Sequence, residues 1–242
     1  MNTASYLSKL AARTLINLVK KSVPPRITYI HDINIEEVFP GLFDWRIELQ
    51  YLSWSYGHLT HDDGLILLAS LVRHIAAKKV FEFGTFSGRT TVNLAINLSS
   101  DRESRVYSLD RAHLAQEEIP KNPQEEGYMD KTDLLRAVFR HKPLPEDLRE
   151  RILLLEGDSR TFDLTQLYGQ MDLVFVDGGH TQEVIASDTG NALKMVRPGG
   201  VIVWDDYGDY FPDVRDCLDA LSGTHPLYRD KKTNLVVHRV AS

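Results

Sequence analysis

A polar turn follows an apolar segment near the middle of the chain. Residues 79–83 are predicted to form a buried strand, and Glu82-x-Gly84-x-x-x-Gly88 leads from it into a helix predicted at 90–98. Gly84 allows a backbone angle or close approach that other residues disfavour, and Gly88 lets the helix N-terminus offer free N–H groups to a ligand. The turn predicts a site for an adenosine-type cofactor, with the residues Glu82, Gly84, Thr85, Phe86, Ser87 and Gly88.

The spacing and charge of this turn disfavour a dinucleotide. Dinucleotide loops follow Gly-x-Gly-x-x-Gly, whereas this turn is Gly-x-x-x-Gly. The carboxylate of Glu82 would repel a pyrophosphate, but it suits a cofactor that carries an ammonium group and a sulfonium. We therefore favour S-adenosylmethionine (SAM) over the cofactors of a nucleotide-dependent oxidoreductase.

Polar residues end the next two predicted strands. Asp110 follows the strand at 105–109 and lies 22 residues beyond Gly88, where an acid accepts hydrogen bonds from ribose hydroxyls. Arg111 comes directly after it. The strand at 152–155 leads to Gly157-Asp158-Ser159, and we expect Asp158 and Ser159 to face an adenine edge. Each acid alone could instead cap a helix or lie in a solvated loop, but together they extend the cofactor site.

A second polar group follows the last two predicted parallel strands. Asp177 ends the strand at 172–176, and Asp205-Asp206 end the strand at 201–204. Three converging carboxylates repel one another unless a cation or protons intervene, and hard oxygen ligands favour Mg²⁺, with Mn²⁺ or Ca²⁺ as alternatives. In a metal-free alternative, Asp177 positions the cofactor and Asp205-Asp206 begin a loop. His180 could take a proton from a substrate hydroxyl, or it could only cap the following helix.

Strands that alternate with helices predict a doubly wound, Rossmann-like α/β fold with a mostly parallel seven-stranded sheet. The carboxyl ends of its strands meet at one edge, where ligands bind. Short extended runs at 226–229 and 235–240 predict a C-terminal antiparallel hairpin. Helices are expected at 64–77, near 131–141, and at 161–168, 180–195 and 212–221, and Thr60-His61-Asp62-Asp63 resembles a capping box.

The segment from Thr60 to Tyr207, about 60% of the chain, resembles the core of the class I SAM-dependent methyltransferases. More narrowly, it resembles the metal-dependent small-molecule O-methyltransferases of the catechol and caffeoyl-CoA type, and more closely the macrocin type, which methylates sugar hydroxyls. The resemblance is carried by Asp63-Gly64, Glu82-x-Gly84-x-x-x-Gly88, Asp110, Asp172-x-x-x-x-Asp177 and Pro198-Gly199-Gly200.

The resemblance implies roles for the second polar group. Asp177, Asp205 and Asp206 occupy positions that bind a divalent metal in these families, where the metal holds the substrate hydroxyls. Many members carry Asp-Asn at the second position, whereas this chain carries Asp-Asp. His180 matches the histidine proposed as base in the macrocin type, so His180 and Asp177 are the expected catalytic residues. A metal-independent methyltransferase of the same fold and a non-catalytic SAM-binding domain are the alternatives.

We expect a methyltransferase domain at 58–242, with an insertion at about 111–150, preceded by an extension at 1–57 that serves as a lid or dimer arm. Residues 1–30 carry five basic residues and no acid, and their apolar spacing predicts an amphipathic helix ending before Pro24. It could pack on the body or on a second subunit, or lie on an anionic membrane surface.

Composition limits the partners and the compartment. The chain has 242 residues and a net charge of −6, and its acidic body argues against nucleic acid. The single cysteine, Cys217, suits a reducing compartment, and no apolar run approaches the roughly 18 residues of a membrane span. We expect a cytoplasmic homodimer that acts on a small-molecule acceptor, without stable membrane insertion.

Overall fold

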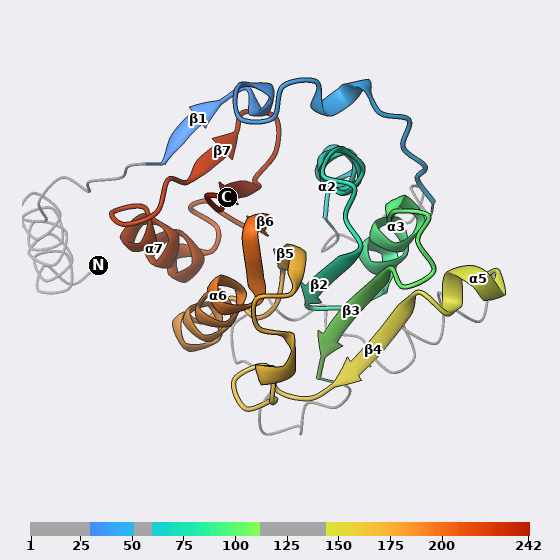
Figure 1. Cartoon of the computed structure of the whole chain (residues 1–242). Coiled ribbons are helices and arrows are strands. Elements are labelled where there is room, and N and C mark those ends of the chain that lie inside the picture. Colours follow the sequence, from blue (N-terminus) through green and yellow to red (C-terminus); the bar gives the residue numbers. More distant parts are fainter. Residues whose placement is uncertain (1–29, 51–59, 112–143) are drawn as a thin grey trace, which may run out of the picture.

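A computed structural model describes residues 30–50, 60–111 and 144–242. Its centre is an eight-stranded sheet in the order β1-β7-β8-β6-β5-β2-β3-β4 (Figure 1). The strands are β1 (His31–Ile33), β2 (Lys79–Phe83), β3 (Arg105–Asp110), β4 (Ile152–Glu156), β5 (Met171–Val176), β6 (Val196–Trp204), β7 (Tyr228–Asp230) and β8 (Val236–Arg239). Among these strands, β8 alone runs antiparallel to its neighbours. The predicted Rossmann-like class, including the C-terminal hairpin, is confirmed.

The sheet has one strand more than the seven that the sequence predicts. The added strand is β1, which pairs in parallel with β7 through His31 and Tyr228. Three residues are too short to show an alternating pattern, so the sequence carries no signal for this strand. Part of the segment assigned to the N-terminal extension therefore completes the sheet, and the short 3₁₀ helices at Ile35–Glu37 and Leu42–Asp44 follow it.

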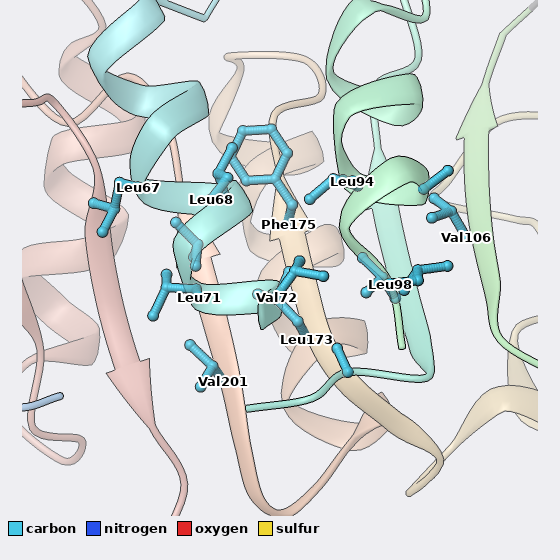
Figure 2. Packing of buried hydrophobic residues seen from close by; sticks show 14 of the residues in the cluster. Leu67, Leu68, Leu71, Val72, Leu94, Leu98, Val106, Leu173, Phe175 and Val201 are labelled. Carbon is cyan, nitrogen blue, oxygen red and sulfur yellow. The ribbon is translucent and has the colours of Figure 1, made fainter. Parts of the chain in front are cut away.

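Helices cover both faces of the sheet and create two hydrophobic cores. On one face, α2 (Asp62–His74) and α3 (Arg89–Asn97) pack on the strands, as Figure 2 shows for Leu68, Leu94 and Phe175. On the other face lie α6 (Gln182–Met195) and α7 (Pro212–Leu221). The short helix α5 (Glu146–Arg149) precedes β4.

Strand alternation assigns each strand residue to one of these faces. In β5, Leu173 and Phe175 join the core beneath α2 and α3, whereas Val174 and Val176 join the core beneath α6 and α7. The same alternation in β2 directs Glu82, between Phe81 and Phe83, toward α3. The position of Glu82 in β2 therefore determines the face of the sheet on which its carboxylate lies.

Two local predictions are wrong. The helix expected at 161–168 is reduced to a 3₁₀ turn at Thr165–Leu167, because Asp163 Oδ1 accepts hydrogen bonds from the N–H and hydroxyl of Thr165 and so competes with helical bonding. The capping box at Thr60 does not form. His61 is the N-cap of α2 and makes no side-chain cap bond, and the hydroxyl of Thr60 contacts Asp177.

Other expectations fall outside the described residues. These are the amphipathic helix before Pro24, the helix near 131–141 and most of the insertion at 111–150. Within the described part of the chain, no helix is both long and apolar enough to cross a membrane.

Candidate active site

Backbone hydrogen bonds that continue the sheet bring the predicted site residues to one edge. The N–H of Gly84 donates to Leu109 O (2.9 Å), and the N–H of Asp177 donates to Phe83 O (3.0 Å). On the far side of β5, the N–H of Asp205 donates to Val176 O (3.1 Å). The turn after β2 and the acids after β5 and β6 are therefore direct neighbours.

The turn between β2 and α3 depends on its two glycines. Gly84 has φ +90°, and a Cβ atom there would lie 1.9 Å from the carbonyl oxygen of Asp177. Gly88 has φ +76° and is the N-cap of α3. Between them Phe86 also has a positive φ, of 44°. Gly84 therefore allows the chain after β2 to approach the Asp177 backbone after β5, a role beyond the ligand contact expected from the sequence.

The remaining turn residues are buried and hydrogen-bonded. Thr85 Oγ1 lies 2.7 Å from Ser108 Oγ in β3, and Ser87 Oγ accepts a long hydrogen bond from the N–H of Arg89 (3.4 Å). Both Thr85 and Ser87 are buried. These contacts shape the turn, so the groups it presents to a ligand are chiefly those of its backbone.

Asp110 lies where ribose recognition was predicted, and its carboxylate organises the turn. Its Oδ2 accepts from the N–H of Phe86 (2.7 Å), and its Oδ1 accepts from the N–H of Arg111 (2.7 Å). Each carboxylate oxygen has a second lone pair. Asp110 can therefore hold the turn and still accept a hydrogen bond from a ligand hydroxyl.

Glu82 is fully buried and does not form an exposed wall of the site. Its Oε2 accepts from Thr91 Oγ1 and from Ser108 Oγ, both at 2.5 Å, and its Oε1 is buried without a hydrogen-bond partner. Burial raises the pKa of Glu82 to about 8, although the two hydroxyl bonds oppose this rise. In this structure Glu82 joins β2, β3 and α3 beneath the turn.

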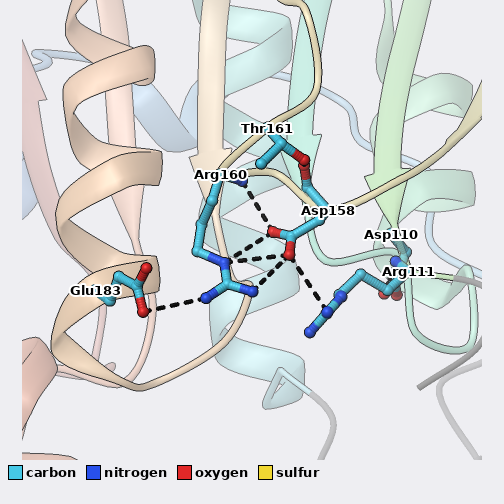
Figure 3. Close-up of polar contacts among 6 residues, drawn as sticks. All are labelled: Asp110, Arg111, Asp158, Arg160, Thr161 and Glu183. Atoms are coloured by element: carbon cyan, nitrogen blue, oxygen red, sulfur yellow. Dashed lines mark hydrogen bonds and ion pairs between the residues drawn. The ribbon is translucent and has the colours of Figure 1, made fainter. Parts of the chain in front are cut away.

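Asp158 is paired with two arginines, Arg160 and Arg111 (Figure 3). Arg160 binds it through two nitrogens, Nε to Oδ1 at 3.0 Å and Nη2 to Oδ2 at 2.6 Å, and Arg111 Nη2 lies 3.3 Å from Oδ2. The bond from Arg160 lowers the pKa of Asp158 to about 2. Glu183 in α6 engages the same guanidinium at 3.1 Å. The sequence does not single out Arg160, because an arginine in a polar loop carries no distinctive pattern.

Contacts with Phe162 and Asp188 also hold the loop after β4. A Cβ atom on Gly157 would lie 2.6 Å from the ring of Phe162. Ser159 forms a hydrogen bond with Asp188 of α6, and burial raises the pKa of Asp188 to about 7. Gly157 and Ser159 therefore set the path of the loop that carries Asp158.

Beyond β5 and β6, three side chains meet closely enough to share one ion. Asp177, His180 and Asp206 each offer a ligand atom, and these atoms lie within 4.8 Å of one another. His180 Nε2 lies 2.8 Å from Asp206 Oδ2, and its ring stacks on Phe211 with centroids 3.9 Å apart. The sequence predicted a group of three carboxylates, Asp177, Asp205 and Asp206. In the structure, His180 is the third member of the close group, and Asp205 lies beside it.

Asp205 acts on its neighbours through charge and hydrogen bonding. Its Oδ1 accepts from the N–H of Asp206 (2.8 Å), which has φ +63°. Burial and the charge of Asp206 raise the pKa of Asp205 to about 6. Burial, together with the charges of Asp205, Asp206 and Glu82, raises the pKa of Asp177 well above its usual range. An added cation would relieve this repulsion.

Thr60 and Phe211 belong to the site and are missed by sequence reasoning. Thr60 Oγ1 donates to Asp177 Oδ2 (3.3 Å). The polar residues after Thr60 resemble a capping box, which hid this contact. Phe211 precedes α7 and supports the His180 ring, and no spacing rule links it to a histidine 31 residues earlier.

The strand order, the glycine turn and the acids at the carboxyl edge define a class I methyltransferase. Residues 81–207, more than half of the chain, match the family described as "Methyltransferase domain". The chain belongs to this family, and the predicted enzyme class, a SAM-dependent methyltransferase, is confirmed.

Solved structures share this fold at low sequence identity. A methyltransferase from Podospora anserina bound to SAH is 14% identical, with 96% of each chain covered and a TM-score of 0.57. An O-methyltransferase from Bacillus cereus in complex with SAH is 18% identical, with 93% of this chain and 97% of that chain covered and a TM-score of 0.50. The O-methyltransferase TomG from Streptomyces achromogenes, involved in tomaymycin synthesis and solved with SAM, is 19% identical, with 88% and 92% covered and a TM-score of 0.50.

Proposed function

We propose that this methyltransferase transfers a methyl group from SAM to a hydroxyl of a small molecule, such as a sugar, a polyketide or a phenolic compound, with the assistance of a divalent metal. The observation that carries the proposal is the group Asp177, His180 and Asp206, whose ligand atoms lie within 4.8 Å. This group adjoins the cofactor turn through the contact between Gly84 and the Asp177 carbonyl. In this proposal, His180 as proton acceptor and Asp177 and Asp206 as metal ligands lie beside the turn that binds the methyl donor.

The similar folds support the transfer to oxygen. Two of them are named O-methyltransferases, and the three were solved with SAH or SAM. We assign the cofactor to the turn from Gly84 to Gly88, to Asp110 and Arg111, and to the loop of Gly157, Asp158 and Ser159. When bound, SAM supplies the methyl group and leaves as S-adenosylhomocysteine (SAH).

The donor set fits a divalent cation. Asp177 and Asp206 offer hard oxygen atoms, which suit Mg²⁺ or Mn²⁺. Asp205 adds a negative charge next to both acids. When bound, the cation would lower the pKa of an acceptor hydroxyl.

In this proposal, His180 receives the proton that the acceptor hydroxyl loses. An imidazole exchanges protons near neutral pH, and Asp206 Oδ2 at 2.8 Å stabilises the positive charge that forms on the ring. Phe211 holds the ring plane by stacking. Because His180 and Asp206 come from different strand ends, the sheet fixes their distance before a ligand binds.

A metal-independent methyltransferase is the second candidate. The contact between His180 Nε2 and Asp206 Oδ2, at 2.8 Å, favours it, because Asp206 already has a partner there without a cation. In this alternative Asp177 serves the cofactor, and His180 remains the base.

The test is SAH release from SAM with panels of sugars, polyketides and phenolic compounds, measured by mass spectrometry with either Mg²⁺ or excess chelator. The proposal expects release with a hydroxyl acceptor in Mg²⁺ and none in chelator. Equal release in both conditions would favour the metal-independent candidate. Methylation of nitrogen or carbon but not oxygen would contradict the proposed transfer to a hydroxyl.

A further inference from the structure

Thr60 lies directly before α2 and contacts both acidic strand ends. Its side chain is buried, with 8% exposure. Oγ1 donates to Asp177 Oδ2 at 3.3 Å, and the carboxylate of Asp205 is an alternative acceptor for the same hydrogen. The third neighbour of the hydroxyl is Thr90 Oγ1, at 3.4 Å. One hydroxyl thus lies between two like-charged carboxylates.

The backbone of Thr60 is held by Arg89, which directly follows the cofactor turn (Gly84–Gly88). Its carbonyl accepts from Arg89 Nη1 at 2.6 Å, and Arg89 Nη2 forms an ion pair with Asp62. Arg89 is buried and is the first residue of α3, directly after Gly88. This contact ties the start of α2 to the turn, so the position of the Thr60 hydroxyl depends on the turn.

The methyl group of Thr60 is also confined. A Cβ atom on Gly64 would lie 2.9 Å from Thr60 Cγ2, so the side chain packs closely against the first turn of α2. With its methyl packed and its carbonyl bonded, Thr60 has little freedom to turn its hydroxyl away. A hydroxyl has one hydrogen to donate, and here the nearby acceptors include Asp177 and Asp205.

We propose that Thr60 is a positioning residue that orients the carboxylate of Asp177 for a divalent cation and that Arg89 holds Thr60 in place. This inference rests on the proposed metal-assisted function. Groups that orient the ligands of a metal typically change its affinity by about 10-fold to 100-fold when removed. Thr60 acts through Asp177 and needs no contact with the cation.

The experiment uses the full chain and measures Mn²⁺ binding by electron paramagnetic resonance and SAM binding by calorimetry. Thr60→Val keeps the shape and loses the hydroxyl. Thr60→Ala and Thr60→Ser both lose the methyl, and only Ser keeps the hydroxyl. Thr90→Val is the matched control, since Thr90 is buried but contacts Thr60 rather than a carboxylate. Circular dichroism confirms that each variant folds.

We expect Thr60→Val and Thr60→Ala to bind Mn²⁺ about tenfold more weakly, and Thr60→Ser and Thr90→Val to stay close to the wild type. SAM affinity should change less than Mn²⁺ affinity in all of them. Wild-type Mn²⁺ affinity in both hydroxyl-free variants would overturn the inference alone, as would equal losses in Thr60→Ser and Thr60→Ala. A wild type that binds SAM but no Mn²⁺ would overturn the metal part of the proposed function and this inference with it.

Discussion

Glu82→Gln should change how the stability of the protein depends on pH. The Glu82 carboxyl has no exposed surface, and burial raises its pKa from 4.5 to about 8. A change of this size corresponds to roughly 5 kcal/mol at about 1.4 kcal/mol per unit of pKa. This free-energy cost arises because an ionised Glu82 would place a charge in the core beneath α3. Two hydroxyls donate hydrogen bonds to Oε2 there, whereas Oε1 has no hydrogen-bond partner.

The sign follows from proton binding. The unfolded chain releases this proton near pH 4.5, whereas the folded chain keeps it until about pH 8. Between these values the unfolded state binds fewer protons, so the free energy of unfolding falls as pH rises, by up to about 1.4 kcal/mol per pH unit. Relative to Glu82→Gln, the wild type should therefore lose about 4 kcal/mol between pH 5 and pH 8.

The assay is urea unfolding at several pH values, and the quantity is the difference between wild type and variant. This difference is needed because raised pKa values of Asp188 and Asp205, to about 7 and about 6, also make the wild type less stable as pH rises. Glu150→Gln, at an exposed carboxyl, is the control and should give a flat difference. A difference for Glu82→Gln that stays within about 0.5 kcal/mol across this range would refute the reasoning.

Three further predictions concern the site. His180→Ala should keep SAM affinity by calorimetry and lower turnover by about 100-fold or more; unchanged turnover would exclude His180 as the base. Excess chelator should abolish turnover and added Mg²⁺ should restore it, and full activity in chelator would support the metal-independent candidate. Gly84→Ala should cost more than about 3 kcal/mol of stability in urea unfolding. Its control, Gly169→Ala, also has a positive φ but nothing within 4 Å of the added Cβ, so it should cost about 1 kcal/mol; equal costs would contradict the clash at Gly84.

The fold was predictable because each strand of the parallel core carries its own signal. Residues 171–176 are buried throughout, and such an apolar run ended by Asp177 is typical of a central parallel strand. The strand at His31–Ile33 was not predictable, because its three residues form a strand only by pairing with β7. The sequence alone shows the local pattern of a segment but not the partner that it meets.

The candidate site was predictable to the level of strand ends. Parallel strands bring their carboxyl ends to one edge, so Asp110, Asp177 and Asp205 could be grouped from the sequence. The detailed contacts were not predictable, because they depend on distant side chains. Asp158 is held by Arg160 and Arg111 rather than left open.

The carboxylates of the adjacent acids Asp205 and Asp206 meet different neighbours at the carboxyl edge of the sheet. Alternation along β6 directs Asp205, like Val201 and Val203, toward α2, where the Thr60 hydroxyl meets it. Asp206 departs from the strand with φ +63°, and its carboxylate meets His180.

The positive φ of Asp206 thus directs the two adjacent carboxylates toward different neighbours. We expect Asp205 to act on the part of the site that contacts Thr60, and Asp206 to act on His180. If so, Asp205→Asn should act mainly on Mn²⁺ affinity, and Asp206→Asn on turnover as well. Identical effects of the two substitutions on both quantities would contradict this division.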